Sequence, residues 1–238
     1  TAQTAVNSLF EDALRGWRTQ AYLSGSGVVT GSLMPDGALR TFGEVHRARA
    51  EGHANAARAL GGTLTAENIA ELLDRLPPIR HRQALCHWDL HGENVRVRGG
   101  QAILIDFLNV KPGPLVVDPA ALETSLALSC TAEAVDWRQV VTELYSIANL
   151  RTLPEVRPPT APLNELWNTV RQIRRFGLAE QLSEDEYVRS VALHLLRHTL
   201  RQVDGEDPLR RPMMALLAER LARELVAVVA GGRMVAPE

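Results

Sequence analysis

The sequence predicts a mainly α-helical protein with one small β-hairpin, and three observations support this fold class. Apolar residues recur at helical spacing through most of the chain after residue 118 and again before residue 77. Between these regions, two short apolar runs flank Gly99-Gly100, a pair typical of a hairpin turn. With 238 residues, 45% of them hydrophobic, the chain is long and apolar enough to bury a core.

The first part of the chain is predicted to be mostly helical. Helical spacing at residues 4–23 is interrupted by the Gly/Ser-rich stretch 24–37, where we expect a loop or a short hairpin. A polar helix with a thin apolar face is expected at residues 44–60. The clearest helix follows, with Thr65 as its N-cap and Pro77-Pro78 as its stop, and it is expected to lead straight into the hairpin.

After the hairpin, almost the whole chain is predicted to be helical. Asp118-Pro119 suits a helix start, because Asp caps well and Pro is preorganised for the first helical position. Further helices are expected at about residues 136–150, 163–176, 183–203 and 207–230. Gly177 is expected to end the second of these, and Ser183-x-x-Glu186 forms a capping box at the start of the third.

Composition and charge narrow the class of protein. A formal net charge of −2 argues against a nucleic-acid partner, since such proteins usually carry a basic patch. Cys86 and Cys130 lie in apolar surroundings, which favours buried thiols in a reducing cytoplasm. No run approaches the roughly 18 apolar residues of a membrane span, so no membrane association is expected. The chain begins at Thr1 without a Met, so we expect it to be a piece of a longer protein.

Three polar residues around the hairpin have the chemistry of a phosphoryl-transfer site. Asp89 lies in the loop before the hairpin, Asn94 enters its first strand and Asp106 leaves its second. Antiparallel pairing is expected to bring Asn94 and Asp106 close together. Their oxygens suit Mg²⁺, which prefers hard oxygen ligands and retains several waters. Asp89 suits the role of orienting an attacking hydroxyl and accepting its proton.

The order His87-x-Asp89-x-x-x-x-Asn94, followed by Ile105-Asp106-Phe107, resembles the catalytic loop and metal-binding Asp of the aminoglycoside and choline kinase-like phosphotransferases. The resemblance implies the C-terminal, helical lobe of a protein-kinase-like fold that uses ATP and Mg²⁺. Asp89 would be the catalytic base, Asn94 and Asp106 would bind the metal and nucleotide, and His87 and Asp118 would support the loop. The stretch Leu90 to Asn94 with Asp118 to Glu123 is particularly similar to the kinase-like ternary-complex-associated domains of bacterial proteins.

The sequence departs from that family before residue 80. The family carries a smaller N-terminal lobe with a Gly-rich loop and a strand lysine, whereas the single lysine here is Lys111, after the hairpin. We therefore expect a single lobe whose N-terminal lobe was excised, was lost or is supplied by another chain. Its parts would be a helical lead-in at 1–80, the catalytic loop and hairpin at 81–115, and a helical subdomain at 116–238.

Other interpretations remain open at the level of sequence. The protein could be a non-catalytic kinase-like scaffold, or the three polar residues could be an ordinary capped loop. His87, Asp89 and His91 alternate and could bind Zn²⁺, and His194 and His198 lie four apart but are more typical of packing histidines. An enzyme would transfer phosphate to a hydroxyl of a small molecule or protein. Acidic residues of the later helices could recognise a cationic substrate.

Overall fold

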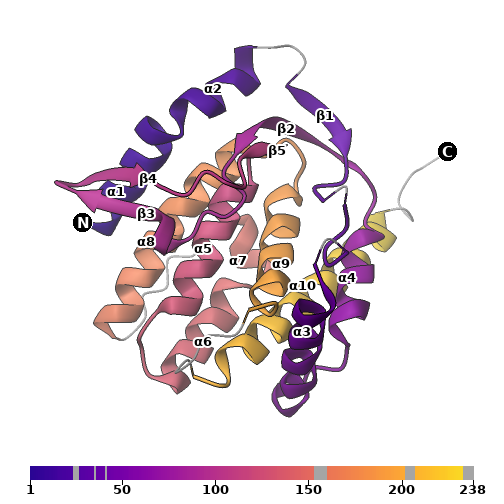
Figure 1. The fold of residues 1–238 in the computed structure, drawn as a ribbon. Coiled ribbons are helices and arrows are strands. Elements are labelled where there is room, and N and C mark those ends of the chain that lie inside the picture. The colour runs from indigo at the N-terminus through magenta and orange to yellow at the C-terminus, as the bar shows by residue number, and fades with distance from the viewer. Residues whose placement is uncertain (24–26, 35, 41, 153–159, 202–206, 233–238) are drawn as a thin grey trace.

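A computed structural model describes residues 1–23, 27–34, 36–40, 42–152, 160–201 and 207–232. The helices are α1 (Ala2–Ser8), α2 (Arg15–Leu23), α3 (Glu44–Ala57), α4 (Ala66–Asp74), α5 (Val117–Ser129), α6 (Ala134–Leu144), α7 (Ile147–Arg151), α8 (Ala161–Glu180), α9 (Glu186–His198) and α10 (Arg210–Gly232), with π or 3₁₀ turns at Leu9–Ala13, Arg58–Leu60 and Gly92–Asn94. The strands are β1 (Val28–Gly31), β2 (Ile79–Cys86), β3 (Val95–Arg98), β4 (Gln101–Leu104) and β5 (Lys111–Pro114). The mainly helical class is thus confirmed, and the strands gather at one end of the helices (Figure 1).

The hairpin is confirmed with its register. Val95 pairs with Leu104 and Arg98 with Gln101, so β3 and β4 run antiparallel across a two-residue turn. Gly99 and Gly100 have φ angles of 59° and 84°. A turn with positive φ at both central residues matches the twist of the flanking strands, and glycine adopts it without steric cost. The two glycines therefore fix where Asn94 and Asp106 emerge.

A second, three-stranded sheet corrects the sequence-based prediction. β2 is its central strand and pairs antiparallel with β1 on one edge and with β5 on the other. We expected no strand between the clear helix and the hairpin, because β2 alternates arginines and histidine where an apolar rhythm would signal a strand. β5 reads Lys-Pro-Gly-Pro, which has little strand propensity, and its prolines are tolerated because it is an edge strand.

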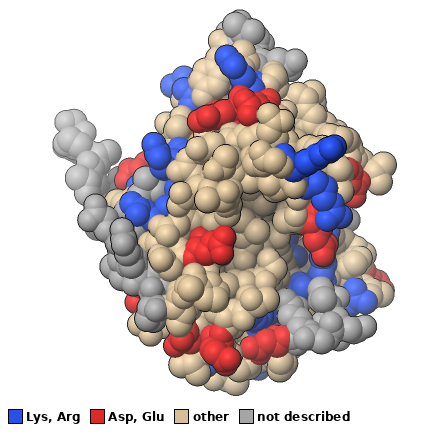
Figure 2. All heavy atoms as spheres, turned by 90° about the vertical axis from the view of Figure 1, so that its left-hand side faces the viewer, with Lys and Arg blue, Asp and Glu red and all other residues tan. Residues whose placement is uncertain are grey.

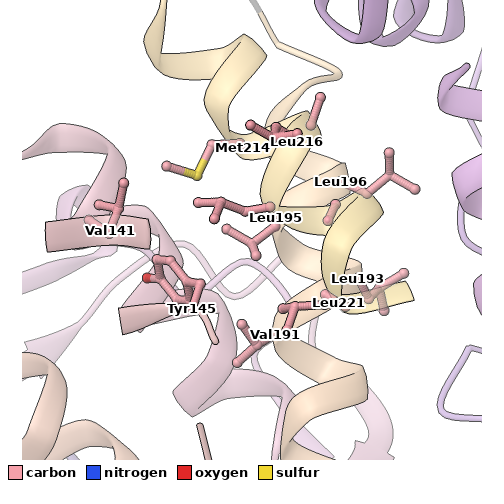
Figure 3. Close-up of a cluster of buried hydrophobic side chains, with 14 of the residues drawn as sticks. Val141, Tyr145, Val191, Leu193, Leu195, Leu196, Met214, Leu216 and Leu221 are labelled. Atoms are coloured by element: carbon pink, nitrogen blue, oxygen red, sulfur yellow. The ribbon is translucent and has the colours of Figure 1, made fainter. Parts of the chain in front are cut away.

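The core lies between α5, α6, α8, α9 and α10. Leu195 of α9 and Met214 of α10 lie toward Val141 of α6 and toward Tyr145, the residue that follows α6 (Figure 3). The polar helix α3 contributes only a thin buried face of Ala50, Ala54 and Ala57, as predicted. Within the part of the chain that the structure describes, no helix has both the length and the apolarity to cross a bilayer.

Several helix boundaries differ from the predicted ones. Thr65 caps α4 as expected, since its hydroxyl accepts the backbone N–H of Asn68 at 3.1 Å. The expected helix at residues 136–150 is two helices, because Ser146 caps a new helix, α7. α9 begins at Glu186, whose carboxylate accepts the N–H of Leu182 at 2.7 Å. α9 ends at His198, so its expected extension through residue 201 is wrong, and residues 202–203 lie outside the described residues.

Gly177 was expected to end its helix, and this is wrong, because α8 continues to Glu180. The glycine is needed for close packing instead: an added Cβ would lie 2.2 Å from Cε2 of the Tyr187 ring. That ring is wholly buried between α8 and the Glu123 carboxylate, to which its hydroxyl donates at 2.7 Å. Tyr187 therefore has little room to move away from a larger residue.

Gly177→Ala is expected to lower the free energy of unfolding by about 1–3 kcal/mol, because the methyl group overpacks a filled site. Gly52→Ala is the matched control, since Gly52 also lies inside a helix but a Cβ there meets nothing within 4 Å. The control should be neutral or raise stability by up to about 1 kcal/mol through helix propensity. Urea denaturation of both variants measures the difference, and equal stabilities would contradict the packing role.

A buried ion pair joins the helices of the core. Arg174 of α8 donates to both carboxylate oxygens of Glu123 of α5, with Nη2 2.6 Å from Oε1, and both side chains are fully buried. The guanidinium also donates to the carbonyl oxygens of Leu144 at 2.8 Å and Asn149 at 3.0 Å. Together with the Tyr187 hydroxyl, these bonds satisfy the pair, which connects five helices around the middle of α5.

Candidate functional site

Asp118 holds the loop that follows β2. Its carboxylate accepts the backbone N–H groups of His87 at 2.8 Å and Trp88 at 3.0 Å. Burial raises the pKa of Asp118, while these two hydrogen bonds favour its charged form. The prediction that Asp118 caps the next helix is wrong, because Val116 is the N-cap residue of α5 and Asp118 lies in its first turn. Asp118 contacts the loop instead.

His87 connects the loop to the end of the hairpin. Its ring is fully buried, and Nε2 lies 3.0 Å from the carbonyl oxygen of Ile105, to which it donates. The ring also lies 5.7 Å from that of Phe107. His87 therefore fixes the loop against the strand that leads to Asp106.

Trp88 has a left-handed backbone with φ of 62°, which is uncommon for a bulky residue. Its indole N–H donates to the carbonyl oxygen of Lys111 at 3.1 Å, and its ring packs so closely on Gly113 that a Cβ there would lie 2.4 Å away. The ammonium of Lys111 lies 4.8 Å from the ring centre. These contacts, with the Asp118 bond, stabilise the strained residue that immediately precedes Asp89.

Asp89 lies at the mouth of a cleft of about 780 Å³. Its Oδ1 accepts from Arg201 at 3.2 Å, and its Oδ2 lies 3.9 Å from Nε2 of His91. The carboxylate is partly exposed, and one oxygen is held by the arginine while the other accepts no hydrogen bond from the described residues. The cleft runs from the loop to the end of α9 and the start of α10.

Asn94 and Asp106 emerge at the same end of the hairpin, as the strand pairing predicts. The backbone N–H of Ile105 donates to the carbonyl of Asn94 at 3.1 Å. Asn94 therefore lies opposite Ile105, and Asp106 is the next residue beyond that pair. The Asn94 amide nitrogen donates to the carbonyl of Asp89 at 2.9 Å, which ties the two candidate functions together. Asp106 is exposed, with φ of 60°. Neither residue lines the cleft that Asp89 faces.

These two side chains fit a Mg²⁺ ion in their chemistry. Because the amide nitrogen of Asn94 is used by the loop, its amide oxygen is the atom left for a cation, and the Asp106 carboxylate supplies a charged oxygen. In the described part of the chain, no group of three or more His, Cys, Asp or Glu side chains could hold a metal, which argues against the zinc interpretation. Mg²⁺ needs only one or two protein oxygens when phosphates and water complete its shell.

A second hollow, of about 400 Å³, lies beside the hairpin and is lined mainly by apolar side chains of α1, β3 and α5. Figure 2 shows the face on this side of the molecule, which is mostly uncharged around its hollowed centre. Leu108, just past Asp106, is 92% exposed, and Phe107 is also exposed. The candidate metal side of the loop therefore borders a largely apolar surface.

Sequence reasoning missed the arginines that face Asp89. His194, Arg197, His198 and Arg201 all line the cleft, at spacings of three, four and seven residues. That spacing places them on one side of α9 and the turn after it. It was visible in the sequence, but nothing local linked the stripe to Asp89, which lies over a hundred residues earlier.

Comparison with known families finds one match. The model of the phosphotransferase enzyme family (APH) matches residues 30–159, more than half of the chain, and this stretch includes the loop, the hairpin and α5. Comparisons with curated proteins and with solved structures give no significant match. The order of the loop residues, the mainly helical fold and the family model agree, and the chain belongs to the phosphotransferase enzyme family.

Proposed function

We propose that this protein transfers the γ-phosphoryl group of ATP, in the presence of Mg²⁺, to a hydroxyl group of a small molecule or a protein. The observation that carries the proposal is the link between its two halves: Asp89 faces an open cleft, and its backbone carbonyl is bonded to Asn94, which shares the end of the hairpin with Asp106. A base for the acceptor and oxygens for a metal are thus held by one loop.

In the proposed reaction, Asp89 accepts the proton of the acceptor hydroxyl on Oδ2, because Oδ1 is engaged by Arg201. The acceptor oxygen forms a bond to the γ-phosphorus as the bond to the β–γ bridging oxygen breaks, and ADP leaves with that oxygen. Asn94 and Asp106 would hold Mg²⁺, which supplies positive charge to the phosphates. Asp118 and His87 keep the loop in place through their bonds to its backbone.

Substitution of Asp106 tests the nucleotide side of the proposal. Asp106→Asn is expected to weaken Mg²⁺-dependent ATP binding about tenfold or more, because it removes a charged ligand. Asn tolerates the left-handed backbone at this exposed position, so the fold should be retained. Asp36→Asn, an exposed aspartate outside the loop and hairpin, is the control. Calorimetric titration with ATP, with and without Mg²⁺, measures both; Mg²⁺-independent binding, or equal binding by Asp106→Asn, would refute the assignment.

A second candidate is a non-catalytic scaffold with the same fold. It is favoured by the position of Lys111, the single lysine of the sequence, which lies on the Trp88 ring instead of before the loop. The family's phosphate-binding lysine then has no counterpart before residue 80. A scaffold would release no ADP with any acceptor and would show no Mg²⁺-dependent nucleotide binding, so the titration above separates the two functions.

A further inference from the structure

The cleft in front of Asp89 is lined by cationic and imidazole side chains. Those of the α9 stripe are His194, Arg197, His198 and Arg201, and the start of α10 adds Arg210 and Arg211. The described acidic side chains of the lining are Asp89 itself, Glu93 and Asp207. Glu93 is 92% exposed, so its charge is largely solvated. The later helices therefore do not present the acidic wall that would suit a cationic substrate.

Among the described residues, no carboxylate is bonded to the guanidinium of Arg197. The guanidinium lies over the ring of Phe42, 5.2 Å from the ring centre, and burial lowers its pKa, although the charge of Asp89 acts to raise it. Its Nη1 is buried and has no hydrogen-bond partner within the described residues. Arg210 provides the contrast, because its guanidinium donates to the carbonyl oxygens of Leu128, Cys130 and Ala132. A buried donor left without a partner is costly, so Arg197 is suited to a bound ligand.

The lowered pKa values of the neighbouring histidines indicate the same positive environment. His194 is almost fully buried, and its Nε2 has no partner among the described residues. The Nε2 of His198 lies 3.0 Å from the Thr124 hydroxyl. Burial, followed by the charges of Arg211, Arg201 and Arg197, lowers the pKa of His198 to about 3. Both rings stay neutral at pH 7, and the arginines supply the charge of the cleft.

We infer that the cleft binds an acceptor that carries an anionic group, a phosphate or a carboxylate, at Arg197 and presents its hydroxyl to Asp89. The role of the hydroxyl rests on the proposed function, whereas the binding of the anion does not. An anionic group supplies an acceptor for Arg197, whose unpartnered Nη1 reaches it after a small side-chain movement, and it balances a cleft whose one described ion pair to Asp89 is that of Arg201. A hydrogen bond from a guanidinium to an anion is charge-assisted and therefore stronger than one between neutral groups, which favours an anion at this position.

Titration with inorganic phosphate, without nucleotide, tests the anion site. We expect saturable binding, followed through the ¹⁵N-labelled arginine side chains by NMR, and Arg197→Met should weaken it about tenfold. Arg201→Met is a second variant that should fold, since that side chain is 61% exposed, and it should also weaken binding. Arg138→Met, an exposed arginine on α6, is the matched control and should bind as the wild type does. Acetate titration tells a phosphate site from a carboxylate site.

Competition then tests the class of acceptor. Glycerol 3-phosphate, an anion with hydroxyl groups, should displace the phosphate, whereas choline, a cation with a hydroxyl group, should not. Absence of saturable binding by either anion, unchanged binding in both arginine variants, or displacement by choline would each overturn the inference. Because Asp106→Asn should still bind phosphate, a protein without nucleotide binding but with the anion site would refute the proposed function and leave this inference standing.

Discussion

Replacing Asp89 with asparagine is expected to slow phosphoryl transfer by about 10²–10⁴-fold, the usual contribution of a positioned general base. The amide retains an oxygen for Arg201 but has no basic oxygen to accept the proton of the acceptor hydroxyl. Affinity for Mg²⁺ and ATP should change little, because Asn94 is bonded to the backbone carbonyl of residue 89 and not to its side chain. ADP release with a saturating acceptor measures the rate, and the titration with ATP measures the affinity.

The control for this variant is Asp185→Asn. Asp185 also accepts from an arginine, with Arg151 Nη2 at 2.7 Å. It is the N-cap residue of α9, whereas the residues of that helix that line the cleft begin at His194. Its substitution removes a paired carboxylate elsewhere and should leave the rate within a few fold of the wild type. Turnover by Asp89→Asn at the wild-type rate would show that Asp89 is not the base, and the loop would then have a structural role alone.

Arg174→Met is expected to lower the free energy of unfolding by about 3–5 kcal/mol, the usual cost of breaking a buried ion pair from one side. The substitution leaves the carboxylate of Glu123 fully buried with the hydroxyl of Tyr187 as its remaining side-chain donor. It also removes the donors of the Leu144 and Asn149 carbonyls. The resulting loss is a large part of the stability of an ordinary domain.

Denaturation in urea or guanidinium measures this loss, with Arg175→Met as the control. Arg175 is the next residue on α8 and is exposed, and within the described residues its side chain bonds to Gln172 alone, so its loss should cost well under 1 kcal/mol. Glu123→Leu combined with Arg174→Met should be more stable than Arg174→Met alone, because no unpaired charge is then buried. Equal effects of the two arginine substitutions would contradict the structural role of the pair.

Local signals in the sequence predicted the elements whose information is local. Gly99-Gly100 fixed the hairpin because both residues need positive φ, and Thr65 was found as a cap because its partner is three residues away. The three-stranded sheet escaped prediction because its strands pair over long range: Thr30 with Arg80, and Gln83 with Pro114. In β2 and β5, neither the apolar rhythm nor the propensity indicates a strand, whereas β1 is rich in β-branched residues and lies where a loop or short hairpin was expected.

The candidate site divides in the same way. The set of Asp89, Asn94 and Asp106 could be predicted from the sequence because all three residues lie in one loop and the hairpin that follows it. The loop-supporting role of Asp118 was expected from the family resemblance, but its predicted role as a helix cap was wrong, because tertiary contact gives its carboxylate to the loop. Arg201 contacts Asp89 across 112 positions of sequence, and only the fold brings them together.

The pairing of β2 with β5 has a consequence for local unfolding. Cys86 lies opposite Lys111, so residues 87–110 leave the sheet and return to it at neighbouring positions. The ends of this excursion are held by strand hydrogen bonds, and its start is held by Asp118 from α5. The pairing of β2 with β5 therefore compensates for the entropy that is lost when the two ends of residues 87–110 are brought together. Opening the candidate site fully means separating β2 from β5, so the slowest amide exchange of the loop should follow that of Leu85 and Cys86.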